Sequence, residues 1–483
     1  MNTGYRNLLR RFCLETSISG LKYFYIYPDR VSRCFWAITM LTMMYVSCIL
    51  TWLLYNRFTE IPTRITIENQ YEPLEGMPFP AITLCSPNQI TISSMMHFNR
   101  TLVDGNLTLD LEKVLPRLQG FYAPLFLEEN DTLDRLQSLI EINRYTITEV
   151  MYSLPQRCED FLRMCVMGLR VYPNCRGLMR PVLTAHGLCC IFNSVYHFRN
   201  NHRNEKDPSL VTWKVKSMSS IILGTLTVVT DYSPTDALDR SILNAGSVRV
   251  MFNDPYEFPS DDEMKMLQPQ SQTFHVIHAT YTYCSEEVQQ LPSWSRKCYF
   301  QDEYKQRFFG DYHNSDCDLL CSVMAVEKEC KCLLFYVPYV FASRACNVSS
   351  IPCILKVKLH MYHYVSPEEC ECPRDCDHRR YRIDSTIGNL RGLNYIYNYP
   401  YSNLVNNEST SIMHFFFKSP AYVKQKQETV MSLITLTSNL GGVFGLCMGC
   451  SAISVLEILF FLYIVIRNYF RHRRQYPVYP VIN

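Results

Sequence analysis

The sequence has little net charge and none of the common catalytic motifs. Its 47 lysines and arginines nearly balance 45 aspartates and glutamates, giving a formal net charge of +2, so it lacks the basic excess of a nucleic-acid-binding protein. It contains no Gly-x-Ser-x-Gly elbow, no His-Glu-x-x-His zinc motif and no glycine-rich phosphate loop. We therefore expect no nucleic-acid partner and no cofactor, and the sequence argues against a membrane-anchored ectoenzyme.

Charge is also missing from a long apolar run near the start of the chain. "CFWAITMLTMMYVSCILTWLLYN", residues 34–56, has no charged residue between Arg33 and Arg57. About 20 apolar residues suffice to cross the hydrocarbon core of a bilayer, so the run predicts a transmembrane helix over 34–56. A cleavable signal peptide is the alternative, but the preceding region is long and no small-residue cleavage site follows.

A second apolar run covers residues 429–466, where Glu457 is the only formal charge. At about 1.5 Å per helical residue, this run is far longer than a ~30 Å hydrocarbon core requires. The run must therefore project beyond the core, tilt strongly or break. We expect it to form the second membrane span.

The charges beside the two runs predict the topology. Residues 1–33 carry six lysines and arginines against two acids, and the tail 467–483 includes "RNYFRHRRQ", with four arginines. Positive flanks stay in the cytoplasm, which places both termini inside and residues 57–428 outside. That middle region also holds 17 of the 22 cysteines, as expected where disulfides persist. All five N-glycosylation sequons fall there too, at Asn99, Asn106, Asn130, Asn347 and Asn407.

The external region has the patterns of a mixed α/β domain. "MPFPAITLCSPNQ", residues 77–89, and the β-branched stretches within 210–280 predict strands. Residues 109–152 have helical periodicity, broken at Pro116. We expect one compact domain.

Cysteine spacing between Cys317 and Cys376 suggests two segments stapled together. The Cys-x3-Cys and Cys-x-Cys pairs at its start are mirrored by Cys-x-Cys-x3-Cys at its end. Cys317 and Cys321 can share a helix face at i, i+4, and so could Cys372 and Cys376. Spacing cannot fix the connectivity. A zinc site is the alternative, but Cys-x-Cys is not the usual finger spacing.

Several motifs in this order resemble the degenerin/epithelial sodium channel family, most of all its insect pickpocket branch. They are "FPAITLC", "GLCCIFN", "RKCYFQDE", the cysteine ladder and "SNLGGVFGLCMGCSAISVLEI". The resemblance implies a trimeric channel, a homo- or heterotrimer of related subunits in the plasma membrane lipid, whose second spans line the pore. The external domain would have a palm β-sheet, a helical finger and a disulfide-ladder thumb over 298–376. Sodium selectivity, amiloride sensitivity and a sensory role in an insect are the implied function.

The resemblance also implies a set of disulfides. The implied pairs are Cys85–Cys189, Cys165–Cys175, Cys298–Cys376, Cys317–Cys372, Cys321–Cys370, Cys330–Cys353 and Cys332–Cys346. Three external cysteines are left over: Cys158, Cys190 and Cys284. An odd number requires at least one thiol or an intermolecular bridge.

In the family, Gly-x-Ser forms a narrow belt where the second span loses helical continuity, and here it is Gly449, Cys450 and Ser451. Glycine tolerates such a break, and the freed carbonyls must face protein or water. Helix packing through Gly-x-x-x-Gly is the alternative reading of these glycines. Glu457 favours a water-filled path, because a carboxylate facing lipid costs several kcal/mol, so three such carboxylates and the carbonyls would pass sodium ions.

Two further positions match gating elements of the family. Ser438 occupies the degenerin position just outside the pore, where a small side chain is needed for closure. Ser19 and Gly20 occupy the place of a cytoplasmic His-Gly gating pair, with a hydroxyl replacing the imidazole. This departure suggests a subunit that works beside a partner subunit.

Two other functions fit the two-span topology. An ATP-gated trimeric channel shares the topology, but not this cysteine ladder or the Gly-x-Ser stretch. A receptor without a pore would leave Glu457 unexplained. The extracellular stimulus or ligand cannot be read from the sequence.

Overall fold

The computed structural model describes residues 10–27, 29–60, 62–103, 109–122, 130–197, 211, 213, 225–338, 344–361, 370–390 and 409–475. The chain divides into two compact units. The first consists of Met1–Ile65, Ser285–Arg296 and Gln427–Asn483, and the second of Thr66–Cys284 and Lys297–Lys426.

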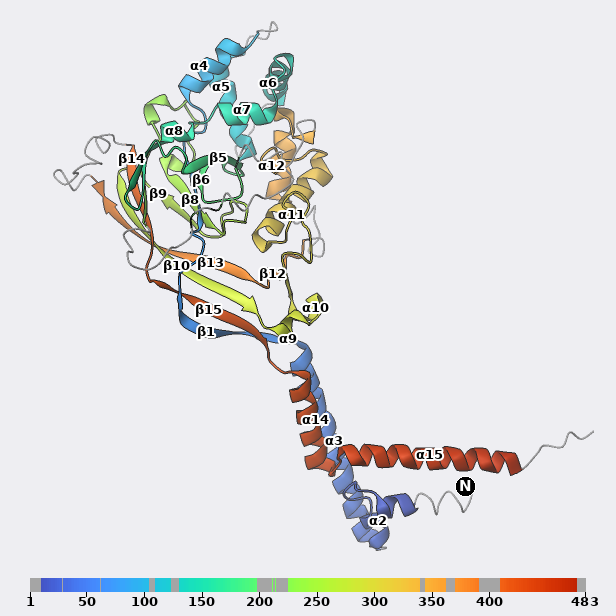
Figure 1. The fold of residues 1–483 in the computed structure, drawn as a ribbon. Coiled ribbons are helices and arrows are strands. Elements are labelled where there is room, and N and C mark those ends of the chain that lie inside the picture. Colours follow the sequence, from blue (N-terminus) through green and yellow to red (C-terminus); the bar gives the residue numbers. More distant parts are fainter. Residues whose placement is uncertain are drawn as a thin grey trace, which may run out of the picture. The chain divides into compact units, whose positions relative to one another are not determined.

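The first unit contains the helices formed by the two apolar runs (Figure 1). Its helices are α2 (Tyr23–Ile26), α3 (Arg30–Glu60), α9 (Glu286–Gln289), α10 (Ser293–Arg296), α14 (Leu433–Met448) and α15 (Ala452–Gln475). Within the described ranges, α3 is by itself long and apolar enough to span a membrane, with a mean hydropathy of 1.8. The pair α14–α15 meets the same test over 433–467 only if it counts as one span bent by 74°.

Helix α3 extends beyond the predicted span of 34–56 at both ends, because Arg30–Arg33 and Arg57–Glu60 continue the helix. Helix α14 is capped at its start by Ser432, whose side chain accepts a hydrogen bond from the Thr435 amide at 3.2 Å and so satisfies one of the unpaired donors at the helix start. The two-helix form of the second run is one of the three outcomes that its excess length allowed.

Two β-sheets form the centre of the second unit. One has eight strands in the order β1 (Thr63–Pro73), β15 (Ala421–Thr429), β10 (Ser271–Cys284), β14 (Thr410–Phe417), β7 (Leu226–Asp231), β3 (Leu162–Met167) and β4 (Arg170–Pro173), with β13 (His378–Asn389) also paired to β10. The other has five, in the order β5 (Met179–Thr184), β6 (Gly187–Phe192), β2 (Ala81–Cys85), β8 (Val248–Asn253) and β9 (Met264–Leu267). The strands predicted within 77–89 and 210–280 are confirmed.

Aromatic side chains from both sheets form one apolar core. The Phe79 ring meets Phe192 and Phe417 edge-on, at centroid distances of 5.7 and 5.4 Å. Phe252 of the five-stranded sheet meets Phe415 of the eight-stranded sheet at 5.8 Å. Such edge-to-face pairs add to the gain from burying large apolar surfaces, and they hold the two sheets together.

A second core is helical. Its helices are α4 (Ile92–Thr101), α5 (Leu111–Val114), η1 (Leu115–Phe121), α6 (Asn130–Ile142), α7 (Ile147–Ser153), α11 (Asn314–Cys330), η8 (Val348–Ser350) and α12 (Ile351–Leu359). Pro116 lies in the first turn of η1, where the chain changes from α-helix to 3-10 helix, as the predicted break at Pro116 required. Shorter elements are α8 (Cys158–Phe161), η5 (Pro234–Asp236), η6 (Asn244–Gly246) and the paired strands β11 (Cys298–Tyr299) and β12 (Arg374–Asp375).

Eight disulfides cross-link the second unit. All seven pairs implied by the resemblance are present, and an eighth joins Cys158 to Cys190. Closing loops in this way removes unfolded-state entropy, typically about 2–4 kcal/mol for each bond. Cys284 stays outside the eight disulfides.

One expectation about the ladder is wrong. Cys317 and Cys321 do lie on α11, but Cys372 and Cys376 flank β12 and have no helix between them. The backbone around Arg374 is instead held extended, because β12 pairs with β11 and the Cys376 amide donates to the Tyr299 carbonyl at 2.9 Å.

Candidate functional site

A left-handed residue interrupts the second apolar run. Helix α14 ends at Met448, Gly449 has φ +65°, and α15 begins at Ala452. The Gly449 amide still donates to the Gly445 carbonyl at 3.0 Å, which is the usual way for a glycine to close a helix. Glycine adopts this conformation without the penalty that a side chain would add. The break falls on the Gly-x-Ser segment, and the two helices beside it are bent by 74°.

An N-terminal segment, residues 16–20, lies against this break. The Ser19 amide donates to the Met448 carbonyl at 3.1 Å. A Cβ on Gly449 would collide with Ser19 Oγ, and a Cβ on Gly20, which has φ +99°, would collide with Met40 Sδ of α3. Both glycines are therefore required for close approach. The structure brings together Ser19, Gly20 and Gly449, which the sequence indicated separately.

The same segment binds Glu457. Its Oε2 accepts hydrogen bonds from the Ser17 amide at 2.9 Å, from Ser17 Oγ at 3.1 Å and from Thr16 Oγ1 at 3.2 Å. Ser17 Oγ also lies 2.6 Å from Oγ of Ser454, which is buried one turn before Glu457. Hydrogen bonds to a carboxylate are stronger than those between neutral groups. They fix the position of Glu457 in the first unit.

Sequence reasoning missed Thr16, Ser17 and Ser454. The signal was the run of hydroxyl residues in "ETSIS", directly before the Ser19–Gly20 pair. A single sequence does not reveal that these hydroxyls meet a carboxylate about 440 positions later.

The remaining predicted site residues lie on α14 or in the break. Ser438 is exposed on α14. The Cys450 amide donates to the Phe444 carbonyl at 3.2 Å, and the Ser451 amide donates to Ser454 Oγ at 3.0 Å. A Cβ at Gly441 would meet no atom within 4 Å. Within one chain, close helix packing therefore does not account for Gly441.

Two of the five sequon asparagines have side chains that the structure describes. Asn99 is exposed near the end of α4. Asn347 Oδ1 caps η8 by accepting from the Ser350 amide at 3.1 Å. Asn106, Asn407 and the side chain of Asn130 lie outside the described residues.

The second unit contains an acidic cavity of about 280 Å³, with a second cavity of about 300 Å³ that shares part of its lining. Arg379 donates to Asp254 at 2.6 and 3.2 Å, which balances one carboxylate charge. The Asn314 amide donates to both Asp375 oxygens at 3.2 Å. The ligand atoms of Glu257, Asp375 and His313 lie within 4.8 Å of one another, a set that could hold a cation.

Burial keeps two of these carboxyl groups protonated at unusually high pH. Burial, followed by the charges of Asp254, Asp316 and Asp375, raises the pKa of Glu257 well above its ordinary value. Burial also raises the pKa of Asp375 to about 7, although the Asn314 amide opposes the shift. Both effects follow from the cost of placing a charge in a poorly solvated site. The cavity therefore takes up protons between mildly acidic and neutral pH.

Comparison with known proteins gives matches over nearly the whole chain. The profile described as "Amiloride-sensitive sodium channel" matches residues 12–461. The chain is 26% identical to "Sodium channel protein Nach" of Drosophila melanogaster over 476 residues, which cover 95% of this chain and 88% of that protein. It is 25% identical to "Pickpocket protein 28" of Drosophila melanogaster, covering 95% and 80%. It is 23% identical to the "Bile acid-sensitive ion channel" of Homo sapiens, covering 94% and 85%.

Replacing Gly449 should release the N-terminal segment. In Gly449→Ala, the new Cβ collides with Ser19 and the left-handed backbone becomes strained, so we expect faster hydrogen exchange at the amides of residues 16–20. Gly441→Ala is the matched control, because its Cβ meets no atom within 4 Å. Unchanged exchange in the Gly449 variant would contradict the docking of this segment.

Replacing Asp375 should flatten the pH dependence of stability. The folded pKa of about 7 lies above the ordinary aspartate value, so the wild type loses stability as pH rises from about 4 through 7, by an amount on the order of a few kcal/mol. Asp375→Asn has no such loss. We expect the variant to have the higher melting temperature at pH 8. At pH 5 the difference in melting temperature between the variant and the wild type should be smaller.

The exposed Asp239 offers the matched control for this measurement, since Asp239→Asn should melt with the wild-type pH profile. Equal pH slopes for the wild type and Asp375→Asn would show that Asp375 is ionised in the folded protein throughout this range.

Proposed function

The chain belongs to the amiloride-sensitive sodium channel family, a family of ion channels and not of enzymes, and we propose that it is a pore-forming subunit of a trimeric sodium-selective cation channel. This is the degenerin/epithelial sodium channel family, and the matches to Nach and pickpocket proteins agree with the predicted pickpocket branch. The proposal extends to amiloride block and to a sensory role in an insect.

One observation carries the proposal. The second apolar run is interrupted at Gly449, and its only carboxylate, Glu457, lies beyond the break with a defined set of hydrogen bonds. A span that needed only to anchor the protein would need neither a break nor a carboxylate, because each is costly next to lipid. In a pore, the break provides carbonyl ligands and the carboxylate attracts cations.

The membrane arrangement that we propose uses α3 as the first span and α14–α15 as the second. Both termini would be cytoplasmic, residues 57–428 extracellular and residues 298–376 the thumb. The eight disulfides support an oxidising location for the second unit. The apolar side chains exposed on α15, such as Leu456, Leu459 and Phe460, would be covered by lipid and by neighbouring subunits.

In the proposed pore, three copies of Gly449, Cys450 and Ser451 would form the selectivity belt and three copies of Glu457 would lie on its cytoplasmic side. All three hydrogen bonds to Glu457 go to Oε2. This leaves Oε1 as the oxygen that would face permeating sodium. The N-terminal segment would thus set the position of the pore carboxylate, which gives Ser19 and Gly20 a route to gating.

The ATP-gated class is disfavoured because residues 12–461 of this chain match the amiloride-sensitive sodium channel family. A receptor without a pore is the second candidate, and the single observation against it is the carboxylate within the broken span. Recording currents from cells that express the chain separates these functions.

Neutralising Glu457 should weaken cation permeation without releasing the N-terminal segment. Glu457→Gln keeps an oxygen acceptor for Ser17 and Thr16 but removes the charge. A unit charge about 4 Å away contributes ~1 kcal/mol even in bulk water, so sodium conductance should fall about fivefold or more, with reduced preference for sodium over potassium. Glu112→Gln, at an exposed position of the second unit, is the control. Wild-type conductance and ion preference in the Glu457 variant would rule out a pore role.

A larger side chain at Ser438 should hold the channel open. Ser438 is exposed on α14 within one chain, so a larger side chain there would collide with a neighbouring subunit and not with its own chain. Ser438→Val should therefore give a large standing current. Thr437→Val is the matched control, since Thr437 is also exposed and bonds only the Ile434 carbonyl through its hydroxyl. A fully closing current from the Ser438 variant would remove this residue from the gate.

The hydroxyl of Ser19 should make the chain dependent on a partner subunit. We expect little current from the chain expressed alone, and current on co-expression with a related subunit that carries histidine at this position. Ser19→His should restore current to the chain alone. Robust current from the unmodified chain would show that it forms working homotrimers.

A further inference from the structure

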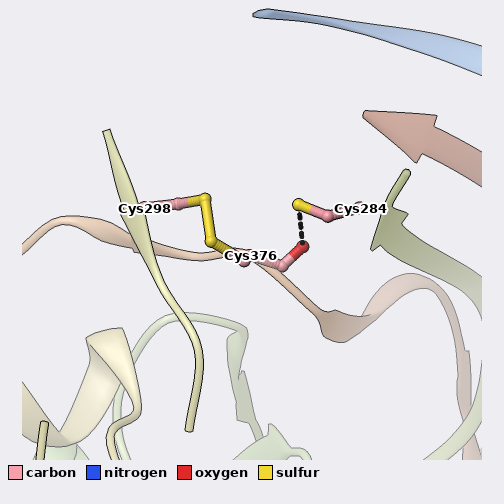
Figure 2. Close-up of side chains that lie close together, drawn as sticks. All are labelled: Cys284, Cys298 and Cys376. Carbon is pink, nitrogen blue, oxygen red and sulfur yellow. Dashed lines mark hydrogen bonds between the residues drawn. A yellow bond between two sulfur atoms is a disulfide. The ribbon is translucent and has the colours of Figure 1, made fainter. Parts of the chain in front are cut away.

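Three cysteines of the second unit lie together in its interior. Cys298 and Cys376 form a disulfide, and Cys284, at the end of β10, has its sulfur within 4.8 Å of both of theirs. All three are at most 2% exposed. Figure 2 shows the Cys284 thiol beside this disulfide, donating to the Cys376 carbonyl at 3.5 Å.

The strand register places Cys284 opposite Cys376. Strands β10 and β13 pair antiparallel, and the last pair is Thr282 with His378. Two further steps along the same register put Cys284 against Cys376, and the Cys284 amide donates to Asp377 at 2.9 Å, in agreement with this alignment. Directly opposed residues of antiparallel strands lie about 4.5–5.5 Å apart at their Cα atoms, within the range that a disulfide bridges.

The protein already contains a disulfide of this kind. Cys85 of β2 and Cys189 of β6 are paired in register, with a Cα–Cα distance of 4.2 Å, and they are bonded. A bond between Cys284 and Cys376 would therefore repeat an arrangement that this fold already accommodates.

We propose that Cys284, Cys298 and Cys376 form a thiol–disulfide exchange site. The Cys284 thiol loses its proton, and its thiolate sulfur attacks the Cys376 sulfur. A Cys284–Cys376 bond forms as the Cys298–Cys376 bond breaks, and the Cys298 thiolate leaves and takes up a proton. One disulfide replaces another, so the step needs no oxidant or reductant. Burial shields the three sulfurs from external reagents and confines the reaction to these partners.

The exchange would change which end of one segment is covalently tied. Cys284 and Cys298 bracket residues 285–296, the only part of the first unit between its N-terminal and C-terminal portions. Within that unit, the Ser285 amide donates to the Gln427 carbonyl at 2.9 Å, and Thr429 donates to Glu287 at 2.6 Å, just before α14 begins. Before exchange, Cys376 is bonded to Cys298, which follows residues 285–296. After exchange, Cys376 is bonded to Cys284, which precedes them.

If the proposed channel function holds, on which this consequence rests, the exchange adjusts the connection between the extracellular domain and the second span. The exchange itself does not depend on that function, because it requires only the three sulfurs and the strand register.

Peptide mapping of the full-length protein in detergent tests the proposal. Samples held at pH 6, 7 and 8 are quenched in acid, denatured, alkylated with N-ethylmaleimide and digested with pepsin without reduction. We expect alkylated Cys298 together with a Cys284–Cys376 cross-linked peptide, which should appear faster at higher pH because the thiolate is the attacking species. Alkylation of Cys284 alone, at every pH and time, would overturn the proposal.

Two variants separate the exchange from misfolding. Cys284→Ser keeps all eight disulfides and should show no alkylated Cys298 at any pH. Cys298→Ser leaves two opposed thiols, which should form the Cys284–Cys376 bond during oxidative folding. If this variant folds and mapping then finds both Cys284 and Cys376 alkylated, the inferred geometry is contradicted. Mapping does not depend on current, so a silent channel leaves this test intact. Exchange that leaves the gating of an active channel unchanged would overturn the regulatory consequence alone.

Discussion

The arrangement of the first unit depends on a short N-terminal segment that occupies the break in the second apolar run. A helix interrupted at Gly449 leaves backbone groups without helical partners, and one of them, the Met448 carbonyl, is bound by the Ser19 amide. The same segment supplies three hydrogen bonds to Glu457. A break and a carboxylate are each unfavourable in an apolar environment, and here one segment satisfies both. Gly449 permits this contact because a Cβ there would collide with Ser19, whereas the absence of a Cβ at Gly20 lets the segment lie close to Met40 of α3.

Covalent constraint dominates the second unit in a similar way. The ladder disulfides fasten α11 to the extended chain around Cys372 and to α12, while the bond between Cys298 and Cys376 lies where the chain re-enters this unit from residues 285–296. The sheet core held by Phe79 and Phe415 carries the other three disulfides, and large aromatic side chains add buried apolar surface there. Five of the eight disulfides fall within residues 298–376, so covalent constraint is densest in the predicted thumb.

Much of the fold could be predicted from the sequence, and the reason differs from element to element. The length and hydropathy of 34–56 predicted a helix, because a bilayer-spanning segment must satisfy its own backbone hydrogen bonds. Strand β2 followed from a short apolar run between turn residues, and β7 and β8 followed from β-branched stretches beside turn dipeptides. The spacing of Cys372 and Cys376 also allowed a helix between them, but the chain there is extended because it pairs with β11. The pairing of Cys158 with Cys190 stayed open, since spacing does not encode connectivity.

The sequence by itself determined the apolar lengths, the location of the cysteines between them, the excess length of the second run and the presence of one carboxylate in it. Each of these is a local property, set by side-chain chemistry over a few consecutive residues. Only the tertiary structure decided that Ser17 binds Glu457, that Glu257 and Asp375 line one cavity, that Gly449 breaks the second run, and that Cys284 lies beside an existing disulfide. These contacts join residues from distant parts of the chain. These contacts stabilise the protein only after folding has brought their partners together, so they cannot be identified from any single stretch of the sequence.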